Sequence, residues 1–172
     1  MNLDGPSLGE DVTLDGRIPR DMSTPFEIEY QFQAHGRDEA ICAMLFHDDT
    51  VFTSAKGDGK GGIKVWNMHG TSSSSATRIM PIHNLDGAHK DEVVALKTLS
   101  SQPSAKDVSD HNLLLSASKD GSFALWDMEG DLVYRCELVD DDEAPTSITC
   151  ADVDTSGEEH VIYLGMSSGE LH

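Results

Sequence analysis

The sequence predicts an all-β fold built from a repeated set of short strands. Apolar and polar residues alternate over runs such as 26–32, a period of two that is typical of half-buried strands. A pattern that begins with Ala-His and closes with Trp-Asn or Trp-Asp occurs twice. No segment of useful length has the apolar spacing of a helix. These observations together predict antiparallel sheets joined by turns.

The expected elements follow one another along the chain. Residues 1–25 are rich in Gly, Pro and Asp without apolar periodicity, which predicts a flexible leader, and a first strand follows at 26–32. The first copy has strand-like runs at 40–46, 51–55, 63–67 and 78–85. The second copy has them at 93–97, 113–118, 123–127 and 132–138. A third copy begins with runs at 147–150 and 161–165.

Three segments of the second copy carry a family resemblance. Ala88-His89, the run from Leu115 through Lys119-Asp120-Gly121, and Trp126-Asp127 resemble the WD-repeat family. The first copy departs slightly, with Ala-His where the family usually has Gly-His and Trp-Asn where it has Trp-Asp. The resemblance covers about residues 26–172, and it implies an incomplete β-propeller of four-stranded antiparallel blades. Its segments would be strand d at 26–32, blade one at 34–86, blade two at 88–138 and a truncated blade three at 145–172.

The resemblance also implies a structural hydrogen-bond chain in each blade, from a His through a Ser or Thr to a Trp, with an Asp beside the His. Blade two would use His89, Ser116 or Ser118, Asp120 and Trp126, with Ser116 favoured. Blade one would use His35, Thr53 or Ser54, Asp58 and Trp66, with Ser54 favoured. Blade three has Ser168 where the Asp should stand and no matching His, so apolar packing is expected to hold it together.

The sequence stops within the expected third copy, which would leave unpaired blade edges. We therefore expect a fragment of a longer protein, whose remaining blades cover those edges, or else self-association.

The net charge of the chain indicates which classes of partner it can be expected to bind. The chain has 31 acidic and 12 basic residues, a formal net charge of −19. This charge repels phosphate groups and disfavours nucleic acid and anionic membranes, while a basic segment of another protein fits it better. The three cysteines form no CxxC pair, and no signal peptide or apolar span is evident. An intracellular location, cytoplasmic or nuclear, is expected.

The sequence has only weak matches to cofactor-binding, metal-binding and catalytic motifs. Residues 57–62 formally match GxGxxG, but a strand rather than a helix is expected next, so a glycine-rich turn is the better interpretation and no cofactor is implied. The run 140–143 lacks the spaced ligands of a calcium loop. Every His-Asp pair that can be placed belongs to the structural chains, and no GxSxG motif is present. We predict no catalytic, cofactor-binding or metal-binding residues.

The predicted function is a non-catalytic protein–protein interaction scaffold that presents loops to other proteins. The alternative is an enzyme or a small-ligand-binding propeller with a central pocket. Partner contacts are expected on the face formed by the loops that precede each copy, where carboxylates gather and lysines interrupt them without cancelling the charge. The residues named for this role are Asp140, Asp141, Asp142, Glu143 and Lys119.

Overall fold

The computed structural model describes residues 33–36, 38–56, 61–68, 80–100, 112–138, 146–157 and 159–172. The chain divides into two units, residues 1–31 and 32–172, and all described residues belong to the second. The leader expected over 1–25 and the strand expected at 26–32 lie outside the described residues.

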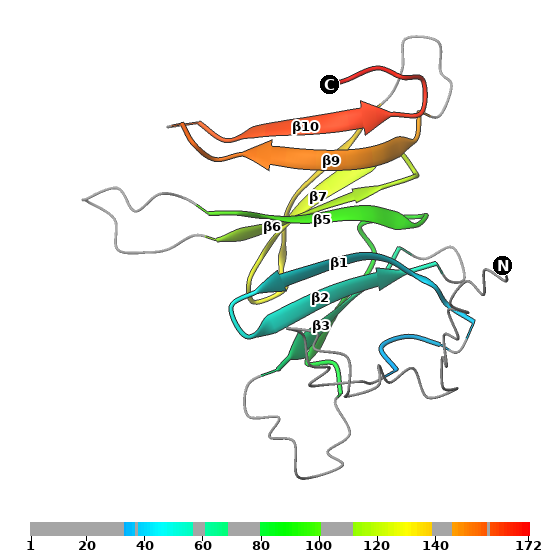
Figure 1. Cartoon of the computed structure of the whole chain (residues 1–172), viewed down its shortest axis with the longest axis vertical. Coiled ribbons are helices and arrows are strands. Elements are labelled where there is room, and N and C mark those ends of the chain that lie inside the picture. The colour runs from blue at the N-terminus through cyan, green and yellow to red at the C-terminus, as the bar shows by residue number, and fades with distance from the viewer. Residues whose placement is uncertain are drawn as a thin grey trace, which may run out of the picture. The chain divides into compact units, whose positions relative to one another are not determined.

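Regular structure in the described residues is entirely β and forms three antiparallel sheets (Figure 1). The first sheet has the order β1 (Ile41–His47), β2 (Thr50–Ala55), β3 (Ile63–Asn67) and β4 (His83–Leu85). The second has the order β5 (Val93–Leu99), β6 (Leu113–Ser118), β7 (Ser122–Asp127) and β8 (Leu132–Glu137). The third pairs β9 (Ile148–Asp154) with β10 (Val161–Met166). The strands lie where the alternation predicts them, except that β4 covers only the end of the run expected at 78–85.

The three sheets repeat one local geometry. In each sheet the first strand has a register shift at its second residue, namely Cys42 in β1, Val94 in β5 and Thr149 in β9. Such a bulge leaves one residue unpaired and increases the local twist. Because the shift recurs at the same place, positions can be matched from sheet to sheet by their pairing. Val51 and Leu114 match, since each pairs with the Trp of its sheet.

Two apolar cores lie between the sheets. One joins the first and second sheets around Phe52, Ile63, Leu96 and Trp126. The other joins the second and third sheets around Leu115, Ala117, Ile148 and Leu164. The second sheet is therefore covered on both faces, which explains the continuous apolar run at the start of β6. Leu114 and Leu115 are both fully buried although they point to opposite faces, and each contributes about 1.5–3 kcal/mol by leaving water.

Glycines allow the loops of one sheet to approach the next. An added Cβ at Gly61 would lie 2.1 Å from the Asp91 carbonyl oxygen, and one at Gly121 would lie 2.4 Å from the Thr146 carbonyl oxygen. Gly121 also has a φ of 80°, in the region that favours glycine. Each glycine stands at the start of the strand that carries the tryptophan. Both positions therefore exclude side chains so that neighbouring sheets can pack closely.

Candidate functional site

The second sheet contains a continuous hydrogen-bonded relay of side chains. Trp126 Nε1 donates to Ser116 Oγ over 2.8 Å, and Ser116 Oγ lies 2.7 Å from His89 Nε2. On the other side of the imidazole, His89 Nδ1 lies 2.7 Å from Ser122 Oγ, and Ser122 Oγ donates to Asp120 Oδ1. We call these five residues the second-sheet relay. Trp126, Ser116, His89 and Ser122 are all buried.

The pattern of donors assigns the protons within the second-sheet relay. Ser122 donates to the carboxylate, so its oxygen accepts from His89 Nδ1–H, and His89 Nε2 then accepts from the Ser116 hydroxyl. The imidazole is therefore neutral. Burial lowers the pKa of His89 to about 4, an effect that Asp120 opposes and Arg135 reinforces. Every hydroxyl in the relay both donates and accepts, an arrangement that fixes structure.

Asp120 closes the relay at the loop that precedes β5. Burial acts to raise the pKa of Asp120, but hydrogen bonds from Ser122 and from the backbone N–H of Lys90 outweigh it and lower this pKa. The Lys90 bond spans 2.6 Å to Asp120 Oδ2. Asp120 therefore ties the loop after β6 to the loop before β5. Ser122 was not among the residues predicted for this hydrogen-bond chain from the sequence. Its hydroxyl, two residues after Asp120, is the feature that could have indicated its role.

The first sheet has a shorter relay. Thr53 Oγ1 accepts from Trp66 Nε1 over 2.8 Å and lies 2.8 Å from His35 Nε2. Burial lowers the pKa of His35, and nearby Lys64 adds to this effect. The carboxylate beside His35 Nδ1 is that of Glu39, 3.9 Å away, which also accepts the Gly36 backbone N–H. We call His35, Thr53, Trp66 and Glu39 the first-sheet relay.

Ser54, the residue favoured for this relay from the sequence, lies elsewhere. Its hydroxyl donates over 2.9 Å to the backbone carbonyl of Val93 in β5. Adjacent residues of a strand point to opposite faces, so Thr53 and Ser54 cannot both reach Trp66. Thr53, the alternative, occupies the relay position, and Ser54 instead joins the first sheet to the second. Ser118, the alternative to Ser116, likewise bonds to a backbone carbonyl, that of Asp91.

Asp58, predicted as the carboxylate of the first copy, lies outside the described residues. Gly61 and Gly121 are matched by their approach to the next sheet and by their spacing from the tryptophans. The residue before Gly121 is Asp120, whereas the residue before Gly61 is Lys60. Gly62 matches Ser122, which explains why the first-sheet relay lacks the second hydroxyl.

The third sheet carries apolar side chains in the same places. Leu164 stands at the position of Ser116 and Thr53, and it packs with Ile148, Ala151 and Met166 against the second sheet. Its contribution to this site is packing.

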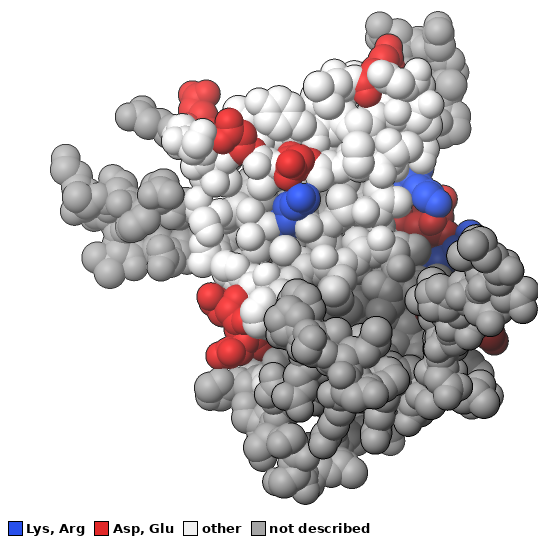
Figure 2. Space-filling model, in the orientation of Figure 1, with Lys and Arg blue, Asp and Glu red and all other residues white. Residues whose placement is uncertain are grey.

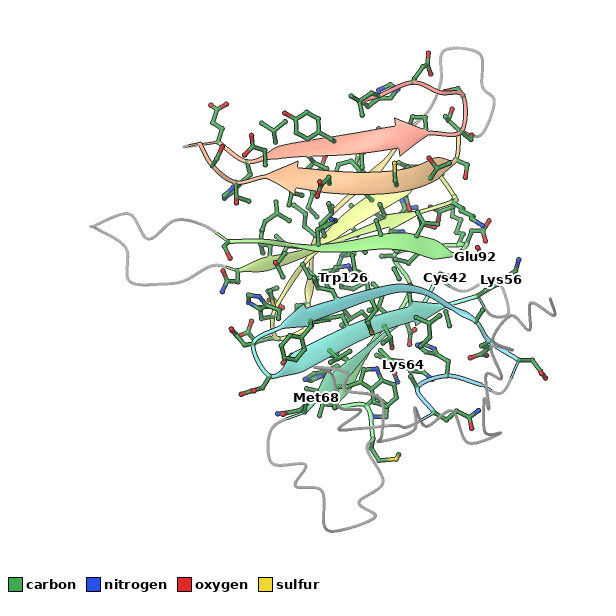
Figure 3. All side chains as sticks on the ribbon, in the orientation of Figure 1. Cys42, Lys56, Lys64, Met68, Glu92 and Trp126 are labelled. Carbon is green, nitrogen blue, oxygen red and sulfur yellow. The ribbon has the colours of Figure 1, made fainter. Side chains whose placement is uncertain are left out.

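Two carboxylates on the face from which partner contacts were predicted are in ion pairs with lysine or arginine. Glu92 lies between Lys56 of the first sheet, 3.2 Å away, and Lys119 of the second (Figure 3 labels Glu92 and Lys56). Its hydrogen bond with Lys119 is the main cause of the lowered pKa of Glu92. Glu137 pairs in the same way with Lys90 and Arg135. Lys119, predicted to bind partners, is thus half-exposed and paired, and residues 140–143 lie outside the described residues.

Carboxylates gather at the opposite ends of the strands, in the β1–β2, β7–β8 and β9–β10 turns. We call this the acidic turn surface, and its described members are Asp48, Asp49, Asp127, Glu129, Asp131, Asp154 and Glu159. The described residues of these three turns include no lysine or arginine. The left edge of Figure 2, where Figure 1 places the β1–β2 and β9–β10 turns, shows red side chains without blue ones.

The described residues were also compared with the requirements of a metal site and of a membrane-spanning helix. Among the residues that the structure describes, no group of three or more His, Cys, Asp or Glu side chains is placed to hold a metal ion. In the same residues, no helix is long and apolar enough to cross a membrane. Comparison with known proteins found no family model that matches the chain and no significant match among the curated proteins.

Proposed function

We propose that this chain is a non-catalytic scaffold for protein–protein interaction, built as part of a WD-repeat β-propeller. The observation that carries the proposal is that two sheets use His, hydroxyl and Trp side chains in matched structural relays. The groups that could act as nucleophile and base are occupied there: Ser116 lies between His89 and Trp126. In the described part of the chain, no buried side-chain nitrogen or oxygen lacks a hydrogen-bond partner.

The partner class follows from charge. A formal net charge of −19 favours a basic protein segment, and the acidic turn surface is the described face where lysine and arginine are lacking. On the opposite face, Glu92 and Glu137 are in ion pairs with lysine or arginine. We therefore assign recruitment of a basic segment to the turns, which connect rigid strands and leave their side chains open to solvent.

A peptide pair tests the assignment. Stopped-flow anisotropy would follow the association of the protein with a labelled lysine-rich peptide at about 20 mM and about 150 mM salt. A labelled glutamate-rich peptide is the control. We expect only the basic peptide to bind, and its association rate to fall as the salt concentration rises. Glu129→Lys should slow association more than Asp86→Lys, which makes the same charge change away from these turns. Equal effects of the two variants, or no binding of the basic peptide, would overturn it.

A further inference from the structure

The first sheet exposes an apolar face that its counterparts bury. Ile41, Met44 and Phe46 of β1 are 52%, 67% and 64% exposed, and we call them the first-sheet outer face. By strand pairing, Ile41 and Met44 match Val93 and Leu96 of β5, which are 0% and 4% exposed against the first sheet.

The third sheet repeats this contrast. By the same pairing, Ile41 and Met44 match Ile148 and Ala151 of β9, which are 0% and 8% exposed against the second sheet. Two of the three sheets therefore use this face to pack on the sheet before them.

The third sheet exposes the complementary face. Tyr163 and Val161 of β10 are 41% and 43% exposed, and with Cys150 and their cross-strand partners Asp152 and Asp154 they form what we call the third-sheet outer face. Tyr163 matches Phe52 of the first sheet and Leu115 of the second, which are 3% and 0% exposed where each packs on the following sheet.

We propose that these two faces bind each other between copies of this chain, head to tail. The third-sheet outer face of one copy packs on the first-sheet outer face of the next, and repeats the packing seen twice within one chain. On the first sheet, the face that this contact would cover presents the exposed Met44 and Phe46. A contact of this kind is heterologous, so it closes into a ring or extends into a filament.

A second copy is the occupant that the structure favours, because the proposed contact continues an interface that exists. Both internal interfaces are made from the same register positions. Two of the matched positions on the third sheet also agree in size with their counterparts. Tyr163 is at the position of the aromatic Phe52, and Gly165 is at the position of the small Ser54 and Ala117. This inference does not rest on the proposed recruitment of a basic segment, although Asp154 of the acidic turn surface pairs with Val161 of the third-sheet outer face.

Sedimentation velocity of the full chain tests the inference. From about 1 to about 200 µM the wild type should shift from 18.6 kDa to larger species. Phe46→Glu and Tyr163→Glu should each weaken association at least about tenfold, because each places an unpaired charge in the contact. Met44→Lys is a second variant of the first face. Val133→Glu is the control, since Val133 is 57% exposed on β8 outside both faces.

Mixing the two glutamate variants separates the outcomes. The Phe46→Glu variant keeps its third-sheet outer face intact, and the Tyr163→Glu variant keeps its first-sheet outer face intact. These two intact faces can bind each other once, so an equimolar mixture should form one-to-one dimers and nothing larger. Circular dichroism checks that each variant is folded. A monomeric wild type at every concentration would overturn the proposal and leave these faces to a different partner. Full self-association of Tyr163→Glu alone would also overturn it, because the first-sheet faces would then be pairing with each other.

Discussion

Trp126 and His89 are joined through a single oxygen atom, the hydroxyl of Ser116, which accepts from the indole over 2.8 Å and lies 2.7 Å from the imidazole. Trp66 and His35 share Thr53 Oγ1 in the same manner. In the first and second sheets, one hydroxyl thus connects two strands with the loop that precedes the sheet. Because these hydroxyl oxygens are buried, no water can take their place as the hydrogen-bond partner of the indole and imidazole nitrogens.

Ser116→Ala should be strongly destabilising for its size. The change leaves the indole N–H of Trp126 and one imidazole nitrogen of His89 buried without a partner, which should lower the free energy of unfolding by about 2–4 kcal/mol. Urea unfolding measures this loss. Ser156→Ala, at an exposed turn, is the matched control and should stay within about 0.5 kcal/mol of the wild type. A loss below about 1 kcal/mol for Ser116→Ala would contradict the shared-oxygen arrangement.

Two substitutions at Thr53 separate the effect of its hydroxyl oxygen from the effect of its side-chain shape. Thr53→Val keeps the branched shape but removes the acceptor of Trp66, so it should cost about 2–4 kcal/mol in the same unfolding assay. Thr53→Ser keeps the oxygen and should cost at most about 1 kcal/mol. If the two variants were equally destabilised, the hydroxyl of Thr53 would have no special role.

Stability should fall in acid because of His89. Its pKa is about 4 in the folded protein and 6.5 when unperturbed, so the unfolded chain binds more protons between these values. The contribution is complete above pH 6.5 and is lost as pH falls toward 4, at about 1.4 kcal/mol per unit and roughly 3 kcal/mol in total.

The control for this pH dependence is His89→Gln, which removes the titrating ring. The difference in free energy of unfolding between wild type and variant, measured by urea denaturation from pH 8 to about pH 4, should shrink as the pH falls. A difference that stays constant over this range would show that His89 titrates normally in the folded protein.

Glu92 should stabilise the contact between the first and second sheets in a salt-dependent way. Glu92→Gln removes the carboxylate that lies between Lys56 and Lys119, so the melting temperature should fall at low salt. The lysines are partly exposed, so the difference from wild type should narrow toward about 1 M sodium chloride. Asp86→Asn is the control and should show little effect at any salt concentration. An effect of Glu92→Gln that persists in high salt would indicate packing rather than charge.

Strand positions are predictable here because alternation and turn residues are local properties. The start of β6, buried on both faces, is apolar throughout, and β1 to β3 follow the expected runs within a residue or two. The histidine, hydroxyl and tryptophan of the second-sheet relay were expected from the resemblance of these residues to the WD-repeat family, and their side chains are hydrogen-bonded.

The remaining parts of the site depend on register and on contacts between distant residues. Thr53 and Ser54 are neighbours with similar side chains, and only the pairing of β2 with β3 decides which of them faces Trp66. Glu39 lies beside His35 because of the course of the loop before β1, which the sequence does not indicate. The balance of charge on each face depends on ion pairs such as Glu92 with Lys119, which form between separate sheets and turns.

The two tryptophans allow the most direct test, since they are the only ones in the chain. Hydrogen exchange of the two indole N–H groups, followed by NMR, reports each relay separately. We predict that both indole N–H groups are strongly protected from exchange in the wild type. Ser116→Ala should speed the exchange of Trp126 alone, and Thr53→Val that of Trp66 alone. Exchange of either indole at the rate of an exposed tryptophan in the wild type would contradict the relays on which the proposed scaffold rests.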